Sequence, residues 1–378
     1  MSEASNLEYA ENEGLSDNER MILEIVRRGN GVTRAAVTGL TNLTQQSVHR
    51  IIDALIEREF LLLGEPVING RGKPSPLVSL NPQARYSIGI SVNTDSTSFC
   101  ITDFACNALH EETLDFSPHE RARTLHALRE RVLKVMADRV ISPKRIAGIG
   151  FAMAGFFVGD EGYFNAPEPL KDWSLRDLRA ELRQLFGTKV WTQNNATTGA
   201  IGECVLGAGL IYPTFGYLSF NYGFGGGIVI DGKPFVGSFG NAGEISRVFT
   251  VEEGPSRPAL GELIKRLNAR GVAVATVSAL RRQFDPNWPG VAEWVEEVSP
   301  FLNRAIDAMR GVIDPAAIVF GGELPSALGD LLLAVPPSRE KPRYGRPAKY
   351  PHIVRSTIEG DPSVLGAALI PLKEQYFQ

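Results

Sequence analysis

Hydrophobic residues recur at helical spacing in three short segments near the start of the chain. Residues 1–15 are acid-rich and aperiodic, and we expect a disordered tail there. After them, Ser16 can cap a helix that runs to Arg28, and a second short helix is predicted to start at Thr33. Thr44 can cap a third helix, whose apolar positions recur at helical spacing. The pattern therefore predicts three helices joined by short turns.

The second and third of these helices are joined by a tight polar turn, and the third begins with small polar side chains. This pattern is typical of a helix-turn-helix, because the N-terminal residues of a recognition helix must reach base edges. Residues 60–63 and 76–80 are predicted strands, and the glycine-rich basic loop between them suits a wing that touches phosphates. We therefore expect a winged helix-turn-helix over residues 16–82. The expected base contacts are Gln45, Gln46, Ser47, His49 and Arg50, and the expected phosphate or minor-groove contacts are Arg71 and Lys73.

A plain three-helix packing unit is the alternative interpretation of this segment. Residues 44–74 carry four Lys or Arg against four acids, so local charge does not separate the two interpretations. On the third helix, however, the acids lie in the C-terminal half, away from the end that would enter a DNA groove. This distribution favours the DNA-binding interpretation.

From residue 83 onward, predicted strands alternate with predicted helices, which is typical of an α/β architecture. Gly225 to Gly227 are predicted to form a β-turn between two of the strands. The strands are expected over residues 86–92, 98–104, 146–151, 190–192, 216–220, 227–230 and 318–322. The helices are expected over residues 118–138, 174–185, 195–206, 260–267, 277–284, 291–313 and 361–372.

Composition narrows the class of protein. The chain has 378 residues, of which 43% are hydrophobic and 22% charged, as in a soluble globular protein of two or three domains. The net charge of -4 does not indicate nucleic-acid binding, so any DNA contact must come from a local surface. The three cysteines lie in apolar surroundings and are expected to be small buried hydrophobes. An acidic start and the lack of a long apolar run favour a cytoplasmic protein without a membrane partner.

Five segments together resemble, in order and spacing, the ROK family, which comprises sugar-responsive repressors and sugar kinases. They are GRGKPSPLVSLNP (70–82), AGIGFAMAG (147–155), QNNATTGAIGE (193–203), FGGGIVIDGKPFVGSFGNAGEI (224–245) and IVFGGELP (318–325). The resemblance implies an actin-like (ribonuclease-H-like) ATPase fold of two lobes that close over a sugar. Residues 83–195, completed by 360–378, would form the first lobe, and residues 196–359 the second, dimerising lobe.

The resemblance also shows where this chain departs from the kinases of the family. Their catalytic base is the Asp of an Asn-Asp-Ala motif, which aligns with Asn195, and an amide cannot accept a proton near neutral pH. In their phosphate hairpin Ser91 replaces an acid, and in their second phosphate loop Tyr222 is expected to fill space that a triphosphate needs. Arg247 replaces a zinc-binding His, and residues 248–265 contain neither Cys nor His. We therefore expect no catalysis, no cofactor and no metal.

A sugar site is what the resemblance leaves in place. Its expected residues are Gly155, Glu168, Asn194, Asn195, Glu244 and Arg247. The Asn pair has a structural alternative, a cap at a strand-to-helix junction. The expected function is a sugar-responsive regulator, in the first place a repressor, that binds double-stranded operator DNA as a homodimer, with a tetramer left open. An active ATP-dependent sugar kinase with a DNA-binding appendage and an orphan regulator without a ligand are the alternatives.

Overall fold

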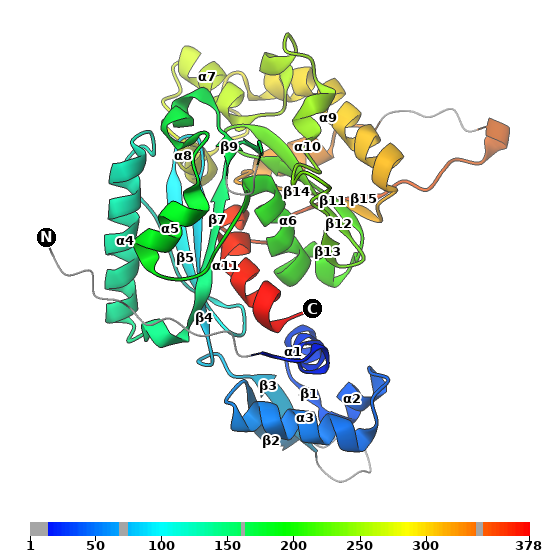
Figure 1. The fold of residues 1–378 in the computed structure, drawn as a ribbon. Helices are drawn as coiled ribbons and strands as arrows, with labels where there is room; N and C mark the ends of the chain where they lie inside the picture. The colour runs from blue at the N-terminus through cyan, green and yellow to red at the C-terminus, as the bar shows by residue number, and fades with distance from the viewer. Residues whose placement is uncertain (1–13, 68–74, 160–162, 338–342) are drawn as a thin grey trace, which may run out of the picture.

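The computed structural model describes residues 14–67, 75–159, 163–337 and 343–378. Three helices and a small antiparallel sheet form an N-terminal unit, which lies below the rest of the chain in Figure 1. The helices are α1 (Asp17–Gly29), α2 (Arg34–Gly39) and α3 (Gln45–Glu57). The strands are β1 (Val32–Thr33), β2 (Leu61–Val67) and β3 (Ser75–Leu80), in the order β1-β3-β2.

Side-chain caps explain where these helices begin. Ser16 and Glu19 form a capping box at the start of α1, and the side chain of Thr44 accepts a hydrogen bond from the Ser47 backbone at 3.2 Å at the start of α3. The apolar face of each helix is buried in one shared core. The three predicted helices and the two predicted strands are therefore present, as a winged helix requires. The expected wing residues Arg71 and Lys73 lie outside the described residues.

The first lobe is built on a five-stranded sheet in the order β10-β7-β4-β5-β6. Helices α4 and α5 cover its outer face and α11 lies on its other face (Figure 1). Its strands are β4 (Tyr86–Val92), β5 (Thr97–Asp103), β6 (Ala108–Thr113), β7 (Ile146–Met153) and β10 (Val190–Asn194). Its helices are α4 (Arg121–Asp138), α5 (Leu178–Phe186) and α11 (Pro362–Tyr376).

The second lobe repeats this plan with the sheet order β13-β12-β11-β14-β15. Helix α6 lies on the face of this sheet that is turned toward α11, and α7 to α9 share a core with the opposite face. Its strands are β11 (Phe215–Phe220), β12 (Phe224–Ile230), β13 (Lys233–Pro234), β14 (Ala317–Gly322) and β15 (His352–Arg355). Its helices are α6 (Asn195–Leu206), α7 (Leu260–Ala269), α8 (Val277–Gln283), α9 (Val291–Ile313) and α10 (Ser326–Leu333).

Short elements lie between the main strands and helices of each lobe. A two-stranded sheet of β8 (Phe156–Phe157) and β9 (Phe164–Asn165) follows β7. The 3-10 helices are η1 (Pro143–Arg145), η2 (Glu168–Trp173), η3 (Ala208–Leu210), η4 (Ile245–Val248), η5 (Gly254–Ser256) and η6 (Arg343–Gly345).

The predicted turn at Gly225 to Gly227 is wrong. These glycines lie inside β12, and the turn is formed instead by residues 221–223. The reason is the close packing of β12 on α6: a Cβ added at Gly227 would lie 2.6 Å from the Cβ of Ala200. Gly225 and Gly227 are therefore required by packing between a strand and a helix, whereas Gly226 faces the backbone of Gly243 and the side chain of Met309.

The architecture confirms the expected fold class, an N-terminal winged helix-turn-helix joined to a two-lobed α/β body. All three cysteines are buried and free, as expected, and burial raises the pKa of the Cys106 thiol to about 12. Among the described residues, no helix is both long and apolar enough to cross a bilayer.

Candidate ligand pocket and recognition helix

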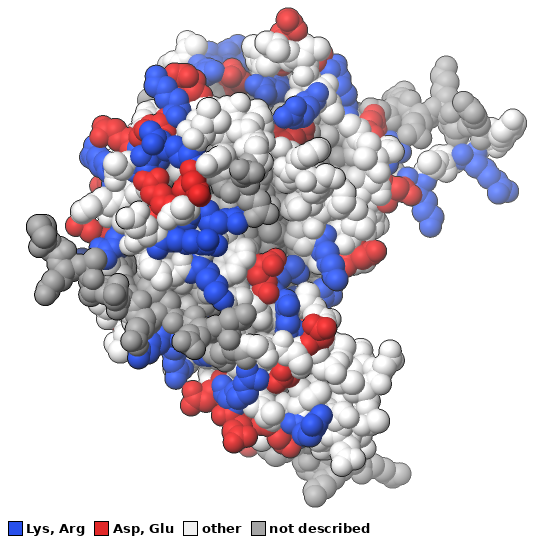
Figure 2. All heavy atoms as spheres, in the orientation of Figure 1, with Lys and Arg blue, Asp and Glu red and all other residues white. Residues whose placement is uncertain are grey.

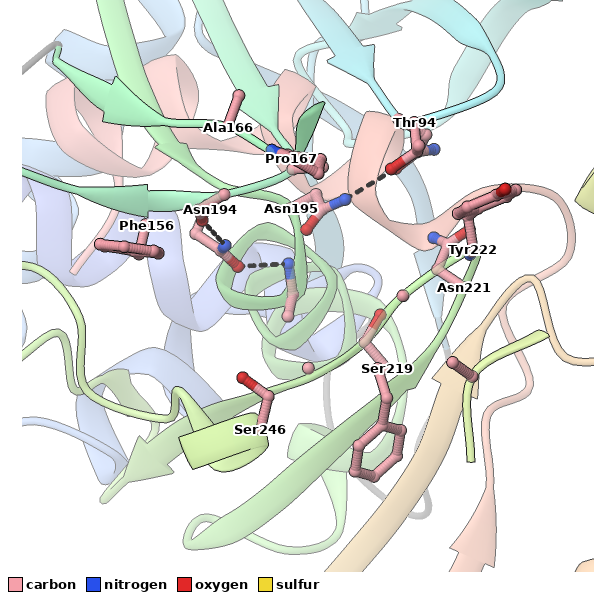
Figure 3. Close-up of a pocket in the computed structure, with 18 of the residues that line it drawn as sticks. Thr94, Phe156, Ala166, Pro167, Asn194, Asn195, Ser219, Asn221, Tyr222 and Ser246 are labelled. Carbon is pink, nitrogen blue, oxygen red and sulfur yellow. Dashed lines mark hydrogen bonds between the residues drawn. The ribbon is translucent and has the colours of Figure 1, made fainter. Parts of the chain in front are cut away.

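A cavity of about 430 Å³ opens between the two lobes. From the first lobe it is lined by residues that follow β4 and β7 and by the last residue of β10, and these strands run parallel to one another. Ligands of parallel α/β sheets bind at this carboxyl edge of the strands. From the second lobe the cavity is lined by the β11–β12 turn and by η4. In Figure 3, Asn194 and Asn195 lie between Phe156 on one side and Tyr222 on the other.

Asn194 is the N-cap of α6 and lines the pocket at the same time. Its side-chain oxygen accepts hydrogen bonds from the backbone of Ala196 at 2.7 Å and of Thr197 at 3.3 Å. Its amide nitrogen donates to the Gly155 carbonyl and, at 3.3 Å, to Glu244. The strand-to-helix cap is therefore present, and the amide nitrogen connects it to two other pocket residues, Gly155 and Glu244.

Asn195 is held by a chain of hydrogen bonds that leads out of the pocket. Its amide nitrogen donates to the side-chain oxygen of Asn93 at 2.7 Å, and the amide nitrogen of Asn93 donates to Asp361 at 3.1 Å (Figure 3 shows the first of these bonds). Asp361 in turn caps α11 through the backbone of Ser363. The Asn195 amide thus acts as a hydrogen-bond donor within the protein.

Ser91 is fully buried in β4 and takes no part in the pocket. Its hydroxyl is hydrogen-bonded to the hydroxyl of Ser363 at 2.8 Å. Ser91 therefore connects β4 to the start of α11 by a hydrogen bond. The resemblance aligns this residue with an acid in the phosphate hairpin of the family kinases. Among the described residues, no group of three or more His, Cys, Asp or Glu is arranged to hold a metal ion.

Glu244 is the carboxylate that faces the pocket next to Asn194. Burial raises the pKa of this carboxyl group, and the charge of Arg247 and a hydrogen bond from Ser246 oppose the increase. A partly buried carboxylate provides strong hydrogen-bond acceptors for the hydroxyl groups of a polyhydroxylated ligand.

Two of the expected sugar-site residues lie outside the pocket lining. Glu168 begins η2 with a largely exposed side chain that pairs with Lys171 at 3.0 Å, because the neighbouring prolines, and not Glu168, face the cavity. Arg247 is exposed, and its guanidinium lies 5.1 Å from the centre of the Phe156 ring. Arg247 therefore influences Glu244 only through its charge.

Several polar pocket residues were not singled out from the sequence. They are Asn93, Asn165, Ser219, Asn221, Ser246, Arg257 and Glu262. Asn93, Asn221 and Arg257 follow directly after a strand or a 3-10 helix, and that position was the available signal. Tyr222, expected to fill phosphate space, lies at the rim shared by this cavity and a neighbouring one.

A group of buried acids lies behind the pocket. Glu323 follows β14 and is only 4% exposed. Burial, followed by the charges of Asp361, Asp95 and Glu111, raises the pKa of Glu323 to about 8, and Arg281 opposes the increase. The carboxyl group of Glu323 is therefore protonated in the folded protein at neutral pH.

Helix α3, the recognition helix expected from the sequence, presents its first turns to solvent. Gln45, Gln46 and Arg50 are exposed, and Arg50 has no ion-pair partner among the described residues. Ser47 is partly buried and its hydroxyl bonds to that of Thr44 at 2.9 Å, so it completes the helix cap. His49 is also partly buried. Of the expected base contacts, three are therefore freely accessible.

Charges on the N-terminal unit are unevenly placed. Figure 2 shows acidic atoms gathered at one end of this unit and an uncharged surface at the other. The exposed acids of α3 and the turn after it, Asp53, Glu57 and Glu59, belong to the C-terminal half of the helix and beyond. The end of α3 that carries Gln45 and Gln46 is free of acids.

Fold and pocket together define a protein with a winged helix-turn-helix and a sugar-kinase-like body. A sequence model of the ROK family matches residues 87–374, and the chain belongs to that family. It is similar to the xylose repressor of Caldicellulosiruptor bescii, with 26% identity over 308 residues that cover 78% of this chain and 73% of that protein.

Two solved structures share the fold. The chain is similar to a ROK family transcriptional regulator described as a homologue of the E. coli MLC protein, with a TM-score of 0.66 and 16% identity over 95% of this chain and 96% of that one. It is also similar to a ROK family glucokinase from Streptomyces griseus in complex with glucose and AMPPNP, with a TM-score of 0.58 and 19% identity over 75% of this chain and 98% of that one. At these identities, the likeness shows the fold alone.

Proposed function

We propose that the protein is a sugar-responsive transcriptional regulator, in the first place a repressor. The N-terminal unit, with proposed bounds of residues 16–82, binds operator DNA through the start of α3. The cavity between the lobes binds a sugar through Asn194, Asn195 and Glu244, with the Gly155 backbone beside them. A homodimer with two-fold symmetry would bind a palindromic operator with half-sites spaced by helical turns.

The observation that carries this proposal is the set of polar side chains in the pocket. It keeps a carboxylate and amides that suit sugar hydroxyls, while the amide of Asn195, at the position of the kinase base, donates to Asn93 at 2.7 Å. A pocket that binds a sugar without a base to activate it suits a sensor. Similarity to a xylose repressor and to a ROK transcriptional regulator supports the same function.

The DNA-binding half of the proposal is tested by an operator titration with a Gln46→Ala, Arg50→Ala double variant. The operator is a duplex selected by the wild-type protein from a randomised pool. Each lost base contact is expected to weaken binding by about 1–3 kcal/mol.

The matched control for that titration is Arg183→Ala, Gln184→Ala, which removes the same residue types from an exposed face of α5. This control should bind the operator as the wild-type protein does. Equal affinity of the Gln46→Ala, Arg50→Ala variant and the wild-type protein would show that α3 is not the recognition helix.

A sugar kinase is the second candidate, and the similarity to a glucokinase in complex with glucose and AMPPNP favours it. We expect no ATP-dependent phosphorylation, because Asn195 cannot accept the hydroxyl proton and Ser91 supplies no acid. A coupled assay with ATP and a panel of pentoses, hexoses and amino sugars checks this. Turnover of about 1 s⁻¹ would establish a kinase instead.

A further inference from the structure

Helix α1 joins the N-terminal unit to both lobes at once. Its buried residues Ile22, Leu23 and Val26 share one hydrophobic core with residues of α6 and α11. Helix α11 lies on the sheet of the first lobe, and α6 lies on the sheet of the second. Any movement of one lobe against the other must therefore be accommodated underneath α1.

An arginine of α1 caps the end of α11. The guanidinium of Arg20 donates to the backbone carbonyl of Phe377 at 3.0 Å and to that of Lys373 at 3.2 Å. The last carbonyls of a helix have no donor within the helix, and a cation is favourable at this negative end of the helix dipole. Arg20 thus attaches α1 to the first lobe through the C-terminal end of its inner helix.

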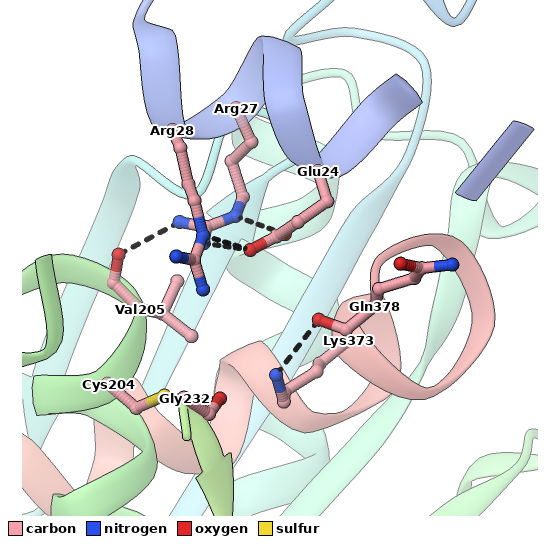
Figure 4. Close-up of polar contacts among 8 residues, drawn as sticks. All are labelled: Glu24, Arg27, Arg28, Cys204, Val205, Gly232, Lys373 and Gln378. Atoms are coloured by element: carbon pink, nitrogen blue, oxygen red, sulfur yellow. Dashed lines mark hydrogen bonds and ion pairs between the residues drawn. The ribbon is translucent and has the colours of Figure 1, made fainter. Parts of the chain in front are cut away.

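A second arginine of α1 caps the end of α6 in the same way. The guanidinium of Arg27 donates to the Val205 carbonyl at 2.8 Å and holds the carboxylate of Glu24 with two further hydrogen bonds of 2.9 and 2.8 Å (Figure 4). Although burial alone would raise it, hydrogen bonds from Arg27 and Arg28 lower the pKa of Glu24. Arg27 is therefore fixed in position and attaches α1 to the second lobe.

Both capped helices begin at the candidate sugar pocket. The N-cap of α6 is Asn194, and the N-cap of α11 is Asp361, which accepts a hydrogen bond from the pocket residue Asn93. The 12 residues of α6 and the 15 residues of α11 correspond to lengths of about 18 and 22 Å at a rise of about 1.5 Å per residue. Each helix thus runs from the pocket to an arginine of α1.

The backbones of the two helices touch in the first third of each helix. A Cβ added at Gly366 of α11 would lie 1.7 Å from the carbonyl oxygen of Thr198 in α6, so only glycine fits there. Because the two backbones are in contact at this point, a rotation of one lobe against the other would turn one helix about the contact and shift the far ends of the helices relative to each other. Arg20 and Arg27, seven residues apart on one face of α1, hold those two ends.

We propose that Arg27 is the positioning residue through which the N-terminal unit follows the second lobe when a sugar closes the pocket. Because α1 caps one helix from each lobe, a change in the angle between α6 and α11 must either rotate α1 or break one cap. Rotation of α1 moves the recognition helix relative to the operator. This inference rests on the proposed function and adds the residue that couples the two sites.

The test measures the affinity for the selected operator with and without D-xylose, D-glucose or N-acetyl-D-glucosamine, using the full chain. In the wild-type protein, the most effective of these sugars should change operator affinity by about 5- to 150-fold. In Arg27→Met, the ratio of operator affinity with sugar to operator affinity without sugar should be close to one. The affinity of this variant for the sugar in the absence of DNA should stay unchanged. Glu24 keeps Arg28 as a partner at 2.6 Å, so this variant leaves no unpaired buried carboxylate.

Two further variants distinguish a loss of coupling between the sugar site and the DNA site from a general loss of structure. Arg27→Lys keeps one donor for the Val205 carbonyl and should restore part of the ratio. Arg176→Met should leave it unchanged, because Arg176 also binds a backbone carbonyl and a carboxylate, both of Asp172, but lies away from α1. A full wild-type ratio in Arg27→Met would overturn this inference alone. A wild-type protein that responds to none of these sugars would overturn the proposed function together with it.

Hydrogen exchange of the wild-type protein provides a second test that needs no variant. The sugar that alters operator affinity should change the protection of backbone amides at both ends of α6 and in residues 20–29. Changed protection around Asn194 with unchanged protection throughout α1 would overturn the inference.

Discussion

Asn195 and Ser91, the positions at which the resemblance predicts a departure from the family kinases, carry side chains with hydrogen-bond partners within the protein. Asn195 donates to Asn93, and Ser91 is hydrogen-bonded to Ser363 at 2.8 Å. Both side chains therefore contribute to a buried polar network that connects the pocket to the start of α11. Restoring a single carboxylate at Asn195 would disturb this network and would still lack the acid at Ser91.

The buried acid Glu323 makes stability depend on pH in a definite direction. Burial first, and then the charge of Asp361, raises its pKa to about 8, whereas the pKa of an unfolded Glu is about 4.3. Its contribution is complete below the unfolded pKa and is lost as the pH rises through the folded pKa. Glu323→Gln resembles the protonated form, so the variant should be more stable than the wild-type protein at pH 8, with a gap that closes toward pH 4.

Thermal unfolding between pH 5 and pH 8 measures this gap, at about 1–2 °C per kcal/mol for a chain of this length. The control is Glu296→Gln, which removes an exposed carboxyl group on α9. An equal dependence on pH in Glu323→Gln and the wild-type protein would contradict the assignment of a buried, protonated Glu323.

The sequence predicts those helices and strands that have a capping residue or a clear apolar periodicity. Capping residues and apolar periodicity located α1 and α3. Asn194, Asn195 and Glu244, which were selected from the family motifs, line one pocket. The edge strands β6 and β15 and the short helix α10 were missed. The half-exposed faces of the two edge strands give no clear alternation.

The rest of the site depends on contacts between residues far apart in the sequence. Asn93 and Asp361 are 268 positions apart, and their hydrogen bond connects the pocket to α11. The β-turn expected at Gly225 to Gly227 was wrong because tertiary packing, against α6 at Gly225 and Gly227, and not local turn geometry, requires these glycines. Neither feature has a signal in local sequence.

At the start of α6, one prediction separates capping from sugar binding. Ser equals Asn as an N-cap but is too short to reach Glu244, whereas Ala cannot cap at all. Asn194→Ser should therefore keep the free energy of unfolding near that of the wild-type protein, and Asn194→Ala should lose about 0.5–2 kcal/mol.

Both variants should lose affinity for the sugar that most stabilises the wild-type protein in a thermal-shift panel. Calorimetric titration measures the affinity, and denaturant unfolding measures the stability. If Asn194→Ser bound the sugar as tightly as the wild-type protein, Asn194 would be a helix cap only.

On the scale of the whole molecule, the N-terminal unit is joined to the two lobes through α1. The sheets of the two lobes are similar in plan, the pocket lies between them, and α6 and α11 run side by side from the pocket to α1 (Figure 1). In this arrangement, a ligand that favours one angle between the lobes can change the orientation of the recognition helix. The ligand can shift the equilibrium only by the difference between its affinities for the two arrangements.

The central claim is that a sugar in the pocket controls DNA binding. The most direct test is the operator affinity of the full chain with and without a sugar that stabilises it, at about 100 times the dissociation constant, where binding adds roughly 2.7 kcal/mol of stability. The account predicts that operator affinity changes by about 5- to 150-fold and that sugar affinity on the operator changes by the same factor. Identical operator affinity with and without the bound sugar would contradict it.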